Sequence, residues 1–336
     1  MQKQSRLGCL SVILFVALGL SLCLNFIFLA AKGSRASGLM AARKLPKFEE
    51  EVVQEGNDGE DNKVAEIFLR GIITSAEPGS IGETMVEDMK LQLQQAVDDK
   101  KVKAIVLYVD SPGGEVTASD IIYNAVRKAR EKKSVVVYMG SLAASGGYYV
   151  SCGGSYLIAN DTTFTGSIGV IMQALHYQGL FEKVGLEMVT FKSGKFKDML
   201  SGTRPITEEE QAYVQGLVMQ TYDKFVGIVA AERKVDEKVL RDGIADGRVV
   251  SGKDALTNKL IDSVGSVEDA FAKAMELGHA SGATVIRYEA PFKLGKLFRV
   301  LGQSDRSSKV EVSVADALKP KLEAGKLYYL PSIYAP

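Results

Sequence analysis

Histidine is almost absent from this sequence: His176 and His279 are the only two in 336 residues. So few imidazoles leave little material for a histidine-rich metal site or for a catalytic relay with histidine as its base. His176 follows a predicted strand and His279 lies near a predicted helix end, and each is more typical of a surface or capping residue than of a base. If this chain catalyses hydrolysis, a residue other than histidine has to act as the base.

Cysteine and excess charge are also scarce. Cys9 and Cys23 lie in an apolar N-terminal run, so Cys152 is the single thiol of the remaining chain and has no partner there for a disulfide. The 41 basic and 41 acidic residues balance, so no overall positive field exists to attract nucleic acid, and no local basic patch of that kind is found. We therefore expect no nucleic-acid partner.

One long uncharged run stands at the N-terminus, from Leu7 to Ala31. A helix of this length, at about 1.5 Å per residue, exceeds a hydrocarbon core of about 30 Å. We predict that residues 1–31 comprise a few N-terminal residues and a retained transmembrane anchor. A cleaved signal peptide or a buried core helix is the alternative, but the run is long for a signal sequence and no small-x-small site stands near Ala30. Basic residues on both sides of the run leave its orientation undecided.

Residues 32–62 are predicted to form an acidic flexible linker. Their second half, KFEEEVVQEGNDGEDN, is rich in turn formers and has little apolar periodicity. The catalytic domain is expected to span residues 63–280, followed by a C-terminal extension and tail at 281–336. The tail ends in LYYLPSIYAP, which is apolar and contains prolines. One hypothesis is that it lies as an extended strand along a groove of its own or a neighbouring subunit, with the substrate cleft as a candidate.

Short apolar runs alternate with helical patterns within the predicted domain. Strands are predicted at 64–69, 104–109, 135–138, 156–159, 169–172 and 188–191, and helices at 82–98, from near 116, after Ser145 and from Thr207 to about Arg233. Thr207 and Glu210 have the spacing of a capping box at the start of the last helix. This alternation predicts an α/β fold with mostly parallel strand pairing.

Two glycine-rich turns follow predicted strands. In DSPGG, Gly113 and Gly114 stand where backbone amides meet ligands in open α/β folds, although an ordinary strand-to-helix turn has the same composition. In SLAASGGYY, Ser145 precedes Gly146 at a predicted helix start, where N–H groups can stabilise an oxyanion. A close-packed helix–strand contact is the alternative, and a nucleophilic serine also needs a base. Neither turn has a dinucleotide or phosphate-loop motif.

Lysine is the alternative to histidine as that base. A lysine deprotonates serine only in its neutral form, so its pKa must fall from about 10.4 towards 7–8 through burial or a nearby cation. The segment FKSGKFKDMLS offers Lys192, Lys195 and Lys197 beside aromatic and apolar residues. Spacing alone does not choose among the three.

Five motifs, taken together in order, resemble the signal peptide peptidase A family of membrane-anchored serine peptidases with a Ser/Lys dyad. They are SPGG at 111–114, SLAASGGYY at 141–149, TGSIGV at 165–170, KSGKFKDMLS at 192–201 and DGRVVSGKDALTNKLID at 246–262. The resemblance covers roughly residues 63–280 and implies a fold like that of the Clp protease proteolytic subunit and the crotonases, with repeated ββα units. The chain's size resembles the short members of the family, which carry one catalytic domain per chain and assemble each site from neighbouring protomers.

The resemblance also implies the roles of individual residues. Ser145 would be the nucleophile, Lys197 the general base and Ser167 the residue that hydrogen-bonds the lysine, while Gly146 and either Gly113 or Gly114 would supply oxyanion-hole amides. Lys192 and Lys195 would then be structural or surface residues. Asp198 has to point away from Lys197, because a carboxylate in contact would favour the charged ammonium.

The activity implied by the resemblance is that of a membrane-anchored endopeptidase. It would degrade remnant signal peptides, and other membrane-associated peptides, through an acyl-enzyme on the outer side of the bacterial cytoplasmic membrane, as a homo-oligomer and without a metal or cofactor. A crotonase-like acyl-CoA enzyme is the main alternative, since it uses the same glycine amides without a serine nucleophile. A catalytically inactive membrane assembly partner is the second alternative. The pair Ser145 and Lys197 argues against the crotonase-like enzyme.

Overall fold

A computed structural model describes residues 18–22, 48–57, 61–75, 85–289 and 328–329 of the chain. The chain divides into two compact units, residues 1–46 and 47–336. The predicted membrane anchor lies outside the described residues except for 18–22, which are helical. Among the residues that the structure describes, none of the helices combines the length and the apolar character needed to cross a bilayer.

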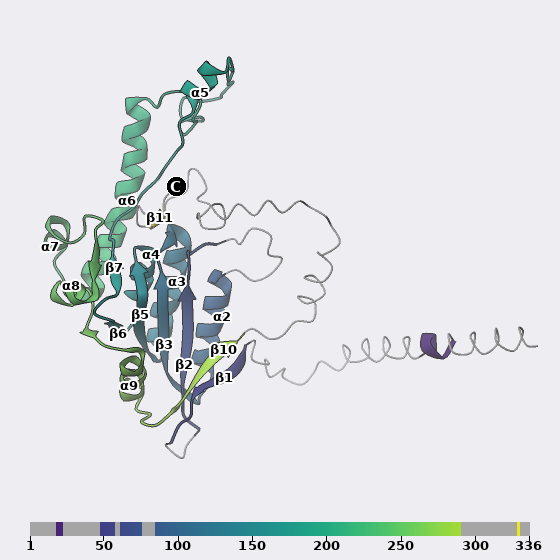
Figure 1. Ribbon diagram of the computed structural model, residues 1–336, viewed down its shortest axis with the longest axis vertical. Coiled ribbons are helices and arrows are strands. Elements are labelled where there is room, and N and C mark those ends of the chain that lie inside the picture. Colours follow the sequence, from purple (N-terminus) through teal and green to yellow (C-terminus); the bar gives the residue numbers. More distant parts are fainter. Residues whose placement is uncertain (1–17, 23–47, 58–60, 76–84, 290–327, 330–336) are drawn as a thin grey trace, which may run out of the picture. The chain divides into compact units, whose positions relative to one another are not determined.

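A mostly parallel β-sheet forms the centre of the second unit (Figure 1). In spatial order its strands are β1 (Glu49–Gln54), β10 (Thr284–Glu289), β2 (Lys63–Arg70), β3 (Val102–Ser111), β5 (Ser134–Ala144), β6 (Tyr156–Ala159) and β9 (Ser263–Val264). Along this path only the pairing of β1 with β10 is antiparallel. The far end of β5 also pairs with β7 (Phe164–Gly166), which pairs antiparallel with β8 (Val249–Ser251). The predicted α/β class with mostly parallel pairing is confirmed.

Both faces of the sheet are covered, which explains why its central strands are continuous apolar runs. On one face, Ile105 and Leu107 of β3 belong to a cluster with residues of α2 (Met85–Asp98) and α3 (Val116–Arg130). On the other, Ala104 and Val106 pack in a second cluster with α9 (Val267–Leu277). Successive β3 residues thus point alternately to the two layers.

The remaining helices follow β5 in the chain. They are α4 (Gly146–Ser151), α5 (Gln178–Lys183), α6 (Glu208–Arg233), α7 (Glu237–Asp242) and α8 (Gly252–Thr257). The predicted capping box is present at α6: Thr207 Oγ1 accepts the Glu210 N–H, and the Glu210 carboxylate accepts the Thr207 N–H. The C-terminal half of α6 lies in the core through Phe225, Val226 and Val229, whereas its N-terminal half leads towards α5, away from the sheet (Figure 1).

The linker prediction is wrong over Glu49–Gln54, because these residues form β1 at the edge of the sheet. All six are exposed, so the acidic side chains stay in water while the backbone pairs with β10. The Glu50 carboxylate also accepts a hydrogen bond from Lys63 Nζ at 2.5 Å. With β1 and β10 in the sheet, the fold extends on both sides of the predicted 63–280 domain.

Four strand predictions are confirmed and two are wrong. Residues 64–69, 104–109, 135–138 and 156–159 lie in β2, β3, β5 and β6. Residues 169–172 contain only an isolated bridge position, and residues 188–191 have no regular structure. The second error has a clear cause: Met188 and Val189 are apolar but exposed, so their hydrophobicity does not report burial in the sheet.

Candidate active site

Ser145 lies at the junction between β5 and α4, in a strained backbone conformation. Its φ is 54° and its ψ is −115°, a combination that costs energy in any residue with a side chain. Hydrogen bonds hold it from both sides: the Ser145 N–H donates to the Gly166 carbonyl, and the Ser145 carbonyl accepts from the Tyr149 N–H, each at 2.8 Å. A sharp strand-to-helix turn of this kind is how several hydrolase folds present a nucleophilic serine.

The Ser145 side chain is buried without a partner. The residue is 1% exposed, and its Oγ forms no hydrogen bond among the residues that the structure describes. Leaving a buried polar group unsatisfied costs about 1–3 kcal/mol. Strain and an unsatisfied hydroxyl at the same residue therefore indicate a functional requirement rather than a packing role.

Gly146 belongs to this turn, and the backbone of Gly113 and Gly114 lies close against it. A Cβ atom on Gly146 would lie 3.1 Å from Gly113 Cα and from Gly114 N, and 2.6 Å from Ser119 Oγ. Gly113 has a φ of 100°, its N–H donates to Ser111 Oγ at 3.1 Å, and its carbonyl accepts from the Ile73 N–H at 2.8 Å. The structure therefore brings Ser145 together with all three glycines singled out from the sequence.

Ser167 lies next to this cluster. It follows Gly166, whose carbonyl binds the Ser145 N–H, and its own N–H donates to the Arg248 carbonyl at 2.8 Å. Like Ser145, it is a buried non-glycine residue with a positive φ, here 51°. Because β5 and β7 pair with Ala144 opposite Gly166, the ends of these two strands place the two serines side by side.

Lys197 lies elsewhere, in an exposed turn after α5. Arg204 binds both Asp198, next to Lys197, and Glu210 in the first turn of α6. Along α6 the rise from Glu210 to Phe225 is about 22 Å, at about 1.5 Å per residue, and the Phe225 ring lies 5.0 Å from that of Tyr149 in α4. Within one chain the structure therefore does not bring Lys197 to Ser145.

The other candidate bases are paired or exposed. Lys192 Nζ lies 2.7 Å from Asp198 Oδ1, and Lys195 Nζ lies 2.5 Å from Glu209 Oε1. His176 and His279 are both exposed. The Asp198 carboxylate accepts hydrogen bonds from Arg204 and Lys192, and these two cations hold its pKa well below the usual range.

Comparison with known proteins identifies the family. Residues 127–281 match the model of peptidase family S49, and residues 60–163 match the Clp protease model. The chain is 36% identical over 245 residues to "Putative signal peptide peptidase SppA" of Enterococcus faecium, which covers 71% of this chain and 70% of the relative. The chain belongs to peptidase family S49.

Two further relatives of this S49 peptidase are much longer than the chain. It is 39% identical over 217 residues to "Protease 4" of Salmonella typhi, covering 64% of this chain and 34% of the relative. It is 33% identical over 229 residues to "Serine protease SPPA, chloroplastic" of Arabidopsis thaliana, covering 66% and 33%. The protein is therefore a serine peptidase with a Clp protease-like fold, as predicted, in place of the crotonase-like alternative.

The region of the S49 peptidase between β7 and α6 exposes many apolar side chains. They belong to Leu175, Leu180, Val184, Leu186, Met188, Val189 and Phe191, of which Phe191 is 95% exposed. We call residues 171–207 the arm. Such a large number of exposed apolar side chains in one segment is typical of an interaction surface.

Ser111 is a residue of the cluster around Ser145 to which the sequence analysis assigned no role. Ser111 is fully buried, donates from Oγ to the Gly71 carbonyl at 2.6 Å and accepts the Gly113 N–H. It therefore determines the direction of one of the two candidate oxyanion amides. Its position in the DSPGG motif was the available signal, but a small polar residue there is equally typical of a turn.

The described part of the C-terminal tail also reaches the site of the S49 peptidase. Strand β11 (Tyr328–Tyr329) pairs antiparallel with β4 (Gly114–Glu115), Tyr329 opposite Gly114. This agrees with the hypothesis of an extended tail along a groove of the chain itself. The remaining residues of the tail lie outside the described part of the chain.

Proposed function

We propose that this S49 peptidase is a membrane-anchored endopeptidase that degrades remnant signal peptides and other membrane-associated peptides through a Ser145/Lys197 dyad. The E. faecium relative named as a signal peptide peptidase supports the substrate class. The uncharged run from Leu7 to Ala31 supports an anchor. In this proposal the catalytic domain lies on the outer side of a bacterial cytoplasmic membrane.

The observation that carries the proposal is the strained, buried and unpartnered Ser145 beside three glycines. Neutral Lys197 takes the proton of Ser145 as Oγ attacks the scissile carbonyl, and then gives a proton to the leaving amine. Water hydrolyses the acyl-enzyme with the lysine as base again. Ser167 hydrogen-bonds and orients the lysine. No step of this mechanism uses a metal or cofactor.

The oxyanion is held by backbone amides in this mechanism. Gly146 is the first residue of α4, and the first N–H groups of a helix have no partner within it. The second donor is the Gly114 amide rather than that of Gly113, because the Gly113 N–H already donates to Ser111 Oγ. The proposed hole therefore consists of Gly114 and Gly146.

The lysine of each site comes from a neighbouring protomer in this proposal. Two features support it: Lys197 stands at the end of α6 remote from Ser145, and the arm that carries it exposes apolar side chains. A second copy of the chain that covers the arm would bury these side chains and bring the lysine to the serine. The functional enzyme is then a homo-oligomer with shared active sites.

Mixing two inactive variants tests both the dyad and its sharing. Ser145→Ala retains the lysine and Lys197→Ala retains the serine, so co-assembled oligomers regain peptidase activity only where the two residues meet across an interface. We expect no activity from either variant alone and clear activity after mixing. No recovery would place the dyad within one chain, and activity of the unmixed Lys197→Ala protein would remove the lysine from the mechanism.

A further inference from the structure

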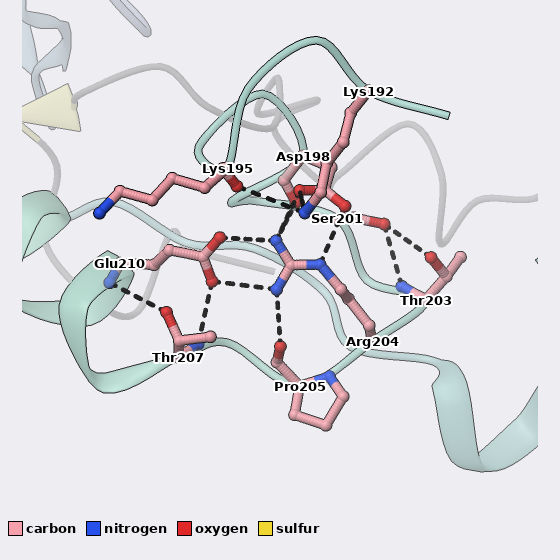
Figure 2. A network of polar contacts seen from close by, with 9 residues as sticks. All are labelled: Lys192, Lys195, Asp198, Ser201, Thr203, Arg204, Pro205, Thr207 and Glu210. Carbon is pink, nitrogen blue, oxygen red and sulfur yellow. Dashed lines mark hydrogen bonds and ion pairs between the residues drawn. The ribbon is translucent and has the colours of Figure 1, made fainter. Parts of the chain in front are cut away.

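Arg204 lies at the centre of a polar network between the turn that carries Lys197 and the start of α6 (Figure 2). Its Nε donates to Asp198 Oδ2 at 3.0 Å and its Nη2 to Asp198 Oδ1 at 2.7 Å. Its Nη1 donates to Glu210 Oε2 at 3.0 Å and its Nη2 to Glu210 Oε1 at 2.6 Å. One guanidinium thus bridges two carboxylates with paired contacts, a geometry that lysine does not reproduce.

The carboxylate on the helix side of the network is firmly held. Glu210 is 3% exposed and also accepts the Thr207 N–H at 2.9 Å in the capping box. Further along α6, Phe225 and Val226 are fully buried in the core. Arg204 therefore connects the Lys197 turn to a helix whose C-terminal half is packed in the protein core.

The turn itself has little apolar support. Its larger apolar residues, Phe196, Met199 and Leu200, are only partly buried, and Lys197 is exposed. The Phe196 ring lies 5.3 Å from that of Tyr213 of α6. The position of the turn relative to α6 is therefore set mainly by the Arg204 network.

Lys197 differs from the other cations of this region. Lys192 and Arg204 pair with Asp198, Lys195 pairs with Glu209, and Arg204 also pairs with Glu210. In the described part of the chain no carboxylate lies within ion-pair distance of Lys197, and Glu208 at the start of α6 has no ion-pair partner either. The carboxylates of this network are thus engaged by cations other than the proposed base.

We propose that Arg204 is a positioning residue for the peptidase reaction: it holds the turn that carries Lys197 and keeps the neighbouring Asp198 carboxylate away from that lysine. The inference rests on the proposed role of Lys197 as the general base. Only a neutral lysine abstracts a proton, and a free carboxylate within about 4–6 Å favours the charged ammonium. Asp198, adjacent in sequence, is the carboxylate that would do this if Arg204 released it.

The test compares Arg204→Gln with a matched control, Arg241→Gln. Arg241 also bridges two carboxylates, Asp223 of α6 and Glu237 of α7, but far from the Lys197 turn. The measurement is kcat/KM for a fluorogenic peptide as a function of pH. We expect Arg204→Gln to lower kcat/KM at neutral pH about 100-fold through misplacement of the base and to move the acid limb of the profile up by about one pH unit. Arg241→Gln should change neither.

A second substitution separates positioning from folding. In Arg204→Gln/Asp198→Asn the freed carboxylate is gone, so the acid limb should return to the wild-type position while the rate stays low. The kcat/KM of Arg204→Lys should lie between the values of the wild type and of Arg204→Gln. Where turnover is too slow, the pH dependence of labelling by a fluorophosphonate replaces kcat/KM, and melting curves report the fold.

Two results would overturn the inference. One is a lower rate in Arg204→Gln with the acid limb unmoved, which is what a purely structural role predicts. The other is a displaced limb that persists in the double variant, which would exclude Asp198 as its cause. Retained activity in Lys197→Ala would instead refute the proposed dyad, so the two failures are distinguishable.

Discussion

The surroundings of Ser145 and those of Lys197 are built by different forces. Ser145 is buried at the end of a central strand, in a turn with no room for a Cβ on Gly146, and its backbone is hydrogen-bonded to Gly166 and Tyr149. Lys197 lies in an exposed turn held to α6 by ion pairs. Core packing therefore determines the serine's geometry, whereas surface electrostatics determines the lysine's.

This difference fits the proposed sharing of the active site. A nucleophile and its oxyanion hole need a rigid frame, which a packed sheet provides. A residue delivered to another subunit has to project beyond its own core, and a long helix with a polar network at its tip accomplishes that.

The two proposed catalytic residues should be equally indispensable although their surroundings differ. Ser145→Ala and Lys197→Ala should each lower kcat by about 10⁴-fold or more, because the members of a catalytic unit fail together. Lys195→Ala is the matched control, since Lys195 lies on the same turn but pairs with Glu209. Peptide hydrolysis by the purified variants measures this, and a large loss in Lys195→Ala would contradict it.

Substitution of a glycine by alanine should be costly in the serine turn and nearly without effect in the lysine turn. Gly146→Ala would place a Cβ 3.1 Å from the backbone of Gly113 and Gly114, whereas Gly194→Ala would meet nothing within 4 Å. We expect Gly146→Ala to cost about 1–3 kcal/mol in the free energy of unfolding and about 100-fold in kcat/KM. Gly194→Ala should be close to neutral in both. Equal stability of the two variants in chemical denaturation would show that the serine turn is less tightly packed than the structure indicates.

Removal of the C-terminal tail should affect the serine region and leave the lysine turn unchanged. Strand β11 occupies the edge of β4 at Gly114, where the proposed mechanism needs a free amide. Truncation after Gly325 removes the pairing of β11 with β4, which we count as about one net hydrogen bond of about 1 kcal/mol. The fraction of molecules with a free Gly114 amide should then rise about fivefold. Activity and fluorophosphonate labelling should rise together. Unchanged rates would mean that the tail does not compete with substrate.

Acid should loosen the lysine turn before it affects the sheet. The Arg204 and Thr207 contacts lower the pKa of Glu210 from its ordinary value of 4.5 to about 2, and the Asp198 pKa is lowered as well. Because these folded-state pKa values are depressed, the stabilisation is complete above the ordinary values and is lost as the pH falls towards about 2. Amide exchange at about pH 5 and about pH 3 should show falling protection near Lys197 and constant protection in β3. A simultaneous loss in both would contradict a separate polar network.

Local sequence patterns predicted most of the central fold. The cores of β2, β3, β5 and β6 are visible as short apolar runs because both faces of the sheet are covered. The α6 capping box is visible because its two residues are three apart in the chain. Strand β1 was missed, since an exposed edge strand needs only backbone pairing and carries no apolar signal.

The arrangement of the candidate site was less accessible from sequence. Motif order pointed to Ser145 and its glycines, and the structure brings them together. The strain at Ser145 and the Ser111 hydrogen bond depend on contacts between segments far apart in the chain. The Arg204 network links residues six apart on either side within a segment of turns, where neither a helical nor a strand pattern applies, so the sequence does not reveal it.

The residues alone show that this serine peptidase has no well-placed histidine and carries several lysines near its motifs. They also indicate which strands are buried, because hydrophobicity and burial coincide in a covered sheet. Two features are visible only in the folded chain: the strain at Ser145, whose Oγ has no partner among the described residues, and the placement of Lys197 beyond the N-terminal end of α6. Both are consequences of non-local packing and hydrogen bonding, which a linear pattern does not encode.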